Sequence, residues 1–165
     1  MSNEKSDPLR PIQDTRGFFM LPQGPVDAGY YTYGLMDGRP DRGGYQYAHP
    51  IMMTAILRVG QEWQAIDKRR FGVGNISRAN RKDDGDHKTH LDGLEVDVRP
   101  LRKDGLHLPV RWDDSGHYDR IATAKLIELF RTFAPVVVIW FNDPEVPFIR
   151  RQNKHDDHFH VGLRG

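Results

Sequence analysis

The segment GLEVDVRP, residues 93–100, decides the fold class, because apolar and charged side chains alternate along it. Successive side chains of a β-strand point to opposite faces, so this period of two predicts a strand over 94–99. The apolar side chains share one face: Leu94, Val96 and Val98. The charged side chains share the other: Glu95, Asp97 and Arg99. Since the apolar face belongs on a core, the charged face is expected to point away from it.

The end of the chain repeats this arrangement in KHDDHFHVGL, residues 154–163. The alternation predicts a last strand over 157–163. Its core face holds apolar side chains: Phe159, Val161 and Leu163. His158 and His160 share the opposite face, whereas Asp157 has the core-side parity unless the strand starts later. Two strands are therefore expected to carry potential metal ligands on the side of one sheet that faces away from the core.

Periodicity and chain-breaking residues place the other elements. They are a helix over 50–66 that begins at Pro50, a strand over 70–76, a helix from a cap at Asp114 or Ser115 to about Phe133, and a buried strand over 136–141. Residues 1–20 are polar and are expected to form a flexible N-terminal arm, with 21–165 as the folded domain. The mixture predicts an α+β fold with a central antiparallel sheet flanked by helices.

Composition excludes several kinds of protein. The 165 residues fit one domain, and 24 Lys and Arg against 23 Asp and Glu give a net charge of +1, without the basic excess of a nucleic-acid-binding protein. The chain contains no cysteine, so any metal must be held by His, Asp or Glu. No apolar run is long enough for a membrane span, and the N-terminal residues lack the apolar stretch of a secretory signal.

Three side chains have the chemistry of a zinc site. Zinc accepts imidazole nitrogen and carboxylate oxygen, and a catalytic zinc keeps three protein ligands plus one open position. His90 precedes Asp97 by seven residues, and Gly93 between them tolerates the bend that would bring the two together. One histidine of the last strand would complete the set. Spacing alone leaves open the alternative that these are ordinary surface histidines.

Both stretches match motifs of one known family. The first motif, His-x-x-Gly-Leu-x-Val-Asp, is matched by His90, Gly93, Leu94, Val96 and Asp97. The second motif, His-x-x-His-x-His-Val, is matched by His155, His158, His160 and Val161. With both motifs in this order, the chain resembles the penicillin-insensitive murein endopeptidases. Their superfamily also holds lysostaphin-type peptidases, D-Ala-D-Ala metallopeptidases and the hedgehog amino-terminal domain.

The resemblance implies a fold like that of the hedgehog and D-Ala-D-Ala-peptidase domains, with zinc on one sheet face. It implies three zinc ligands: His90, Asp97 and His160. It also implies that His158 is a catalytic histidine beside the metal, with His155 as a second one. The D-Ala-D-Ala branch carries a glutamate base directly before the catalytic histidine. Asp157 stands at that position here, so it stays a rival of His158 as the proton carrier.

Three further residues are candidates for the surroundings of the site. Glu95 shares a strand face with Asp97, so it is expected to orient a ligand or to bind substrate, with an exposed salt bridge as the alternative. Arg78 follows a strand that leads into the site loop and is the candidate for binding a substrate carboxylate. His87 is a candidate for contacting a ligand or the substrate, and plain solvent exposure is the alternative.

The resemblance implies a zinc-dependent endopeptidase that cleaves peptide bonds in peptidoglycan. The alternatives are a D,D-carboxypeptidase or dipeptidase of the same superfamily, and a non-catalytic, hedgehog-like zinc domain that binds a partner. Without a visible signal peptide, action in the periplasm or on the cell wall requires export, injection or lysis. A phage lysis protein and an injected antibacterial effector are both consistent with this, and the second would have a cognate immunity protein as a partner.

Overall fold

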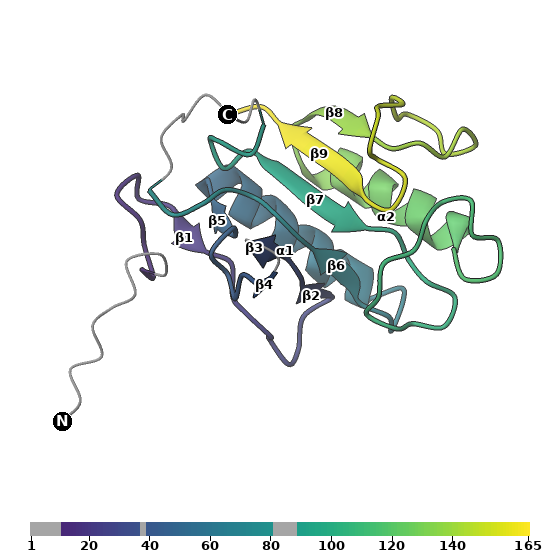
Figure 1. Ribbon diagram of the computed structural model, residues 1–165, viewed down its shortest axis with the longest axis horizontal. Helices are drawn as coiled ribbons and strands as arrows, with labels where there is room; N and C mark the ends of the chain where they lie inside the picture. The colour runs from purple at the N-terminus through teal and green to yellow at the C-terminus, as the bar shows by residue number, and fades with distance from the viewer. Residues whose placement is uncertain (1–10, 37–38, 81–88) are drawn as a thin grey trace.

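A mixed five-stranded sheet forms the centre of the computed structural model, which describes residues 11–36, 39–80 and 89–165 (Figure 1). Its strands, in spatial order, are β2 (Tyr30–Thr32), β6 (Phe71–Val73), β7 (Glu95–Arg99), β9 (Phe159–Leu163) and β8 (Val136–Trp140). The α+β class is confirmed. The sheet is mixed rather than antiparallel, however, because β2 runs parallel to β6 while the other neighbours are antiparallel.

The two helices of the described chain, α1 (Pro50–Gln64) and α2 (Arg120–Phe133), lie on the same face of the sheet (Figure 1). Trp63 of α1 meets the Phe71 ring edge to face, and Phe130 of α2 lies between Phe71 and Phe159 with ring centroids 6.1 and 6.2 Å away. The helices therefore flank the sheet on one face (Figure 1). The other face stays uncovered by helices, and the charged side of β7 points to it.

Short pairs of strands complete the described fold. β1 (Phe19–Met20) pairs with β5 (Tyr47–Ala48), and β3 (Leu35–Met36) pairs with β4 (Arg39–Pro40). No helix in the described part of the chain has both the length and the apolar character needed to cross a bilayer.

Residues 11–20 belong to the folded body, so the flexible arm predicted over 1–20 does not extend across them. The Asp14 carboxylate is buried and accepts hydrogen bonds from the backbone N–H groups of Phe18 and Asn80, at 3.1 and 2.9 Å. Arg16 forms an ion pair with Asp14 at 2.7 Å and donates to the Leu91 carbonyl oxygen at 2.7 Å. The N-terminal segment thus fixes the loop that follows His90.

Two predictions are wrong: the residue that caps α2 and the full burial of β8. α2 is capped by Asp119, whose side chain accepts from the Ala122 N–H at 3.0 Å, and not by Asp114 or Ser115. The Asp114 carboxylate instead accepts from the backbone N–H of Gly116 at 3.1 Å, which closes a turn before the helix. β8 is not fully buried, because it lies at the sheet edge and leaves Val137 54% exposed.

The Phe130 side chain gives a test of this packing. Phe130 is fully buried between the rings of two strands, so Phe130→Ala should lower the free energy of unfolding by about 3–5 kcal/mol. Ile121→Ala on the same helix is the matched control, because Ile121 is 83% exposed and should change stability by only about 0.5 kcal/mol. Urea unfolding measures both, and equal losses would contradict this packing.

Candidate metal centre

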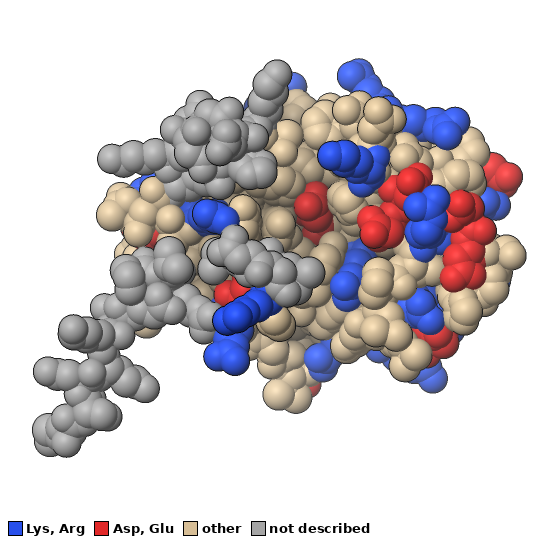
Figure 2. Space-filling view, in the orientation of Figure 1, with Lys and Arg blue, Asp and Glu red and all other residues tan. Residues whose placement is uncertain are grey.

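Three side chains converge on the sheet face that the helices leave uncovered. One ligand atom each from His90, Asp97 and His160 lie within 4.8 Å of one another, so this group could hold a metal ion. Asp97 Oδ1 lies 3.1 Å from Nδ1 of His160 and 3.3 Å from Nε2 of His90. The three predicted ligands therefore meet in space. Figure 2 shows this face, with acidic side chains over β7 in its middle.

The pairing of β7 with β9 brings Asp97 and His160 together. The two strands are antiparallel with Asp97 directly opposite His160 in the register. Because side chains of directly opposed residues share a sheet face, both groups point the same way. Each strand buries its alternate apolar residues on the helix-covered side, as the alternation predicted: Val96, Val98, Phe159 and Val161.

A tight bend brings His90 to the same place. Gly93 has a φ of +73°, and a Cβ there would lie 2.6 Å from the backbone nitrogen of His49. Only glycine fits this conformation and this approach. His90 itself has a φ of +60°, which turns its side chain toward the strand that follows. The bend expected at Gly93 is therefore present.

Hydrogen bonds orient the two imidazole rings. Nδ1 of His90 lies 3.0 Å from the Ile76 carbonyl oxygen, and since a carbonyl only accepts, Nδ1 donates there and Nε2 is the nitrogen turned toward Asp97. Nε2 of His160 lies 3.3 Å from the Glu95 carboxylate, which leaves Nδ1 on the side of Asp97. The indole of Trp140 stacks on the His160 ring with centroids 4.6 Å apart.

The Asp97 carboxylate and the His160 imidazole shift each other's pKa. Burial disfavours the charged form of Asp97, but hydrogen bonds from His160 and His90 outweigh it and lower the pKa of Asp97 well below its usual value. Burial favours neutral His160, but its hydrogen bonds with Asp97 and Glu95 raise its pKa to about 9. Metal ligation needs an unprotonated imidazole nitrogen and an ionised carboxylate. A bound cation would therefore compete with the proton that His160 holds.

Glu95 connects two of the predicted ligands. One carboxylate oxygen accepts from the backbone N–H of His90, and the other lies 3.3 Å from Nε2 of His160. Burial raises the pKa of Glu95, but the hydrogen bond with His160 and the backbone N–H of His90 outweigh it and lower that pKa. Of the two roles proposed for Glu95, orienting a ligand is the one that this geometry supports.

Glu95→Gln should therefore weaken metal binding without removing a ligand. A carboxylate that holds a ligating histidine contributes roughly 10- to 100-fold to metal affinity. We expect a loss of this size, measured by competition with a chromophoric zinc chelator at pH 7. Glu62→Gln is the matched control, because Glu62 lies on α1 and, among the residues that the structure describes, forms an ion pair with Arg58 alone. Unchanged zinc affinity of the Glu95 variant would contradict the orienting role.

The three proposed catalytic side chains lie in the loop before β9. His158 Nε2 is 3.8 Å from Asp97 Oδ1, and its Nδ1 is 2.8 Å from the Asp157 carboxylate. The His155 ring lies beside two other imidazoles: its centroid is 4.9 Å from that of His158 and 5.9 Å from that of His160. β9 starts at Phe159, two residues later than predicted, so the Asp157 side chain is 54% exposed and does not face the core.

The pKa values of these groups shift in different directions. Burial disfavours charged His158, but its hydrogen bond with Asp157 and the charge of Asp97 outweigh this and raise its pKa. The same hydrogen bond lowers the pKa of Asp157. Burial lowers the pKa of His155. The neighbouring imidazoles of His155 and His158 thus differ in proton affinity.

Arg78, predicted to bind a substrate carboxylate, does not join the site. The guanidinium of Arg78 lies 4.9 Å over the Tyr45 ring, and its backbone oxygen accepts from Arg16 at 2.7 Å, rather than contacting the ligands. His87 lies outside the described residues. Sequence reasoning also missed Trp140, because the register that pairs Trp140 with His160 depends on tertiary contacts.

No protein-family model matches the chain, and a search of the curated proteins finds no match.

Proposed function

We propose that the chain is a zinc-dependent peptidoglycan endopeptidase with a hedgehog- and D-Ala-D-Ala-peptidase-like fold. The observation that carries the proposal is the meeting of two imidazoles and one carboxylate beside a further histidine pair, His158 and His155. The order of the two sequence motifs supports the substrate class. The proposal includes the settings considered above, a lysis protein or an injected effector, with an immunity protein as the partner in the second case.

The donor set fits zinc. Two imidazole nitrogens and a carboxylate oxygen are ligands that zinc accepts, and His-rich sites without thiolate are typical of catalytic zinc. Structural zinc sites are closed by four protein ligands, whereas the group in the described chain has three. This favours an enzyme over the non-catalytic hedgehog-like alternative, since a three-ligand site keeps a position for water or substrate.

Zinc in such a site lowers the pKa of water toward about 7 and polarises a carbonyl group. The chain's own contribution is proton handling at His158. Its Nδ1 donates to Asp157, which holds the ring in place and leaves Nε2 facing Asp97 and the site. In this position Nε2 can take a proton from attacking water and hold positive charge near a developing oxyanion. His155, beside His158, is the proposed donor to the leaving amine.

The test is digestion of purified peptidoglycan sacculi followed by mass spectrometry of the released muropeptides. We expect cross-linked dimers to be converted to monomers, with full loss of activity in a chelator and recovery on adding zinc. Release of terminal D-alanine from pentapeptide monomers alone would instead identify the D,D-carboxypeptidase. Equal cleavage by metal-stripped and untreated protein would overturn the zinc mechanism.

A further inference from the structure

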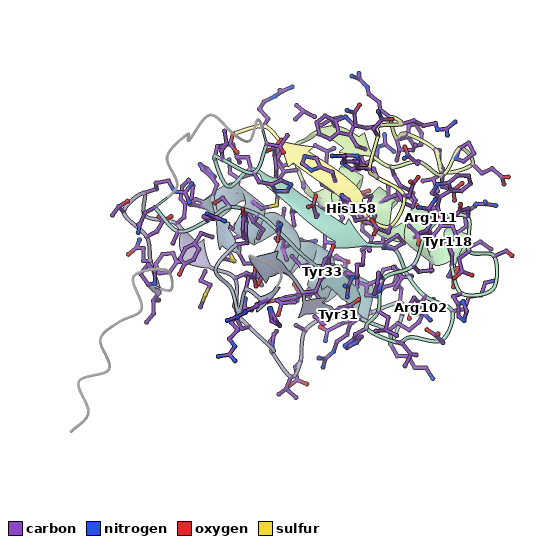
Figure 3. The ribbon with its side chains drawn as sticks, viewed as in Figure 1. Tyr31, Tyr33, Arg102, Arg111, Tyr118 and His158 are labelled. Carbon is purple, nitrogen blue, oxygen red and sulfur yellow. The ribbon has the colours of Figure 1, made fainter. Side chains whose placement is uncertain are left out.

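A cleft adjoins the metal centre on the β2 side of the sheet. It has a volume of about 470 Å³ and is lined by Tyr33, Gly34, Pro40, Asn75, Asp97 and Arg99. Asp97 and Arg99 lie two residues apart on β7 and share its charged face. The cleft therefore reaches from a predicted metal ligand to a cation that belongs to neither sequence motif. Figure 3 shows Tyr33 and Tyr31 on the β2 side and His158 near the start of β9.

Arg99 has no acidic partner among the described residues. Its guanidinium carbon lies 3.9 Å over the Tyr33 ring, and one N–H group donates to the His107 carbonyl oxygen at 3.4 Å. Arg102 and Arg111, farther along, form ion pairs with Asp104 and Asp113 at 2.5 and 3.0 Å. The Arg99 side chain also hydrogen-bonds Tyr31. A guanidinium stacked on a ring keeps its remaining in-plane N–H groups available for a planar anion.

The aromatic platform beneath Arg99 is held by the backbone. A Cβ on Gly74 would lie 2.6 Å from the Tyr33 ring, and a Cβ on Gly72 would lie 2.8 Å from that of Tyr31. The Tyr31 ring therefore lies against β6 at Gly72, and the Tyr33 ring lies against Gly74, directly after that strand. The Tyr33 N–H also donates to the Val73 carbonyl oxygen at 2.9 Å, which fixes the residue beside the sheet.

We infer that Tyr33 and Arg99 form a subsite that binds a carboxylate of the substrate next to the scissile bond. A stacked guanidinium presents two parallel N–H donors to a carboxylate, which is the strongest geometry of such pairs. The subsite deepens the proposed function and rests on it, since it places the reacting bond at the metal centre. The carboxylate has two sources: the C-terminus of a stem peptide, or the free carboxylate of a cross-linking residue.

Kinetics on matched peptides test the inference. Each of two synthetic substrates, a linear pentapeptide and a cross-linked dimer, is made with the carboxylate and with a carboxamide in its place. The wild type should prefer one carboxylate form by about tenfold to 100-fold in kcat/KM. The substrate that shows the preference identifies the source. Arg99→Gln should remove the preference mainly through KM, leave the carboxamide rate unchanged, and be partly rescued in Arg99→Lys.

Arg58→Gln is the matched control, because Arg58 lies on α1, away from the cleft, and its loss should leave the preference intact. Equal losses on carboxylate and carboxamide substrates in Arg99→Gln would overturn the inference. So would the absence of any preference in the wild type.

A binding measurement separates this inference from the proposed function. The same peptides are titrated into His158→Ala and into His158→Ala with Arg99→Gln, with zinc present, and heat is measured. Preferential binding of a carboxylate form that disappears with Arg99→Gln supports the subsite even if the wild type cleaves nothing, and then only the endopeptidase fails. Equal binding by the two proteins, or no binding by either, overturns the subsite.

Discussion

Alanine in place of His160 should leave the protein without bound zinc and without endopeptidase activity. Among the three predicted ligands, His160 has the most support from its surroundings: Asp97 and Glu95 contact its two nitrogens, and Trp140 stacks on its ring. Its removal leaves only His90 and Asp97. Since loss of an outer hydrogen-bond partner already costs roughly 10- to 100-fold in affinity, loss of the ligand should exceed about 100-fold.

The measurement is zinc content after dialysis, with muropeptide release as the activity readout. The His160 side chain is only 2% exposed, so this variant also leaves a gap under Trp140, and thermal unfolding must show that it folds. His90→Ala keeps the test decisive, because His90 lies in a loop and its side chain is 16% exposed. His117→Ala is the control, since the exposed His117 side chain pairs with Asp114 outside the site. Retained zinc in both ligand variants would place the metal elsewhere.

Alanine in place of His158 should separate catalysis from metal binding. His158 is not in the three-ligand group, but its Nε2 faces Asp97 and its Nδ1 is held by Asp157. We expect zinc content to stay at the wild-type level and kcat to fall by about 10²- to 10⁴-fold, as is typical for loss of a general acid–base group. Single-turnover digestion of a cross-linked dimer at saturating protein measures the chemical step.

Two companion variants decide among the three proposed proton carriers. Asp157→Asn should lower kcat less than His158→Ala, because Asp157 is largely exposed and acts by holding the His158 ring. His155→Ala should lower kcat on cross-linked substrates, because the leaving amine needs a proton. A larger loss in Asp157→Asn than in His158→Ala would make Asp157 the base. Loss of zinc in His158→Ala would make His158 a ligand.

Local sequence was sufficient to predict the strands and side-chain faces of the centre. The period of two over 94–99 and in the final strand placed Asp97 and His160 on the face opposite the apolar side chains, and Gly93 indicated the bend after His90. Helix α1 was predicted within two residues at its end. These predictions succeeded because each depends on neighbours in the chain: alternation, a proline at the first turn, or a glycine with positive φ.

Other features depended on residues far apart in the sequence. The parallel pairing of β2, the edge position of β8 and the placement of both helices on one face follow from how the elements pack together. The cap at Asp119 was missed because Asp114 has the same chemistry and closes a preceding turn. Arg78 was chosen for its place before the site loop, whereas Arg99 lines the cleft.

By itself, then, the sequence determined the ligand types and the strand faces that carry them, because side-chain alternation is a local property of an extended chain. The tertiary structure decided which atoms meet. The register of β7 against β9 sets Asp97 opposite His160, and the bend at Gly93 returns His90 to that pair. Glu95, Trp140 and the Tyr33–Arg99 pair acquire their places only through this pairing, since distances across a sheet are fixed by register and not by spacing along the chain.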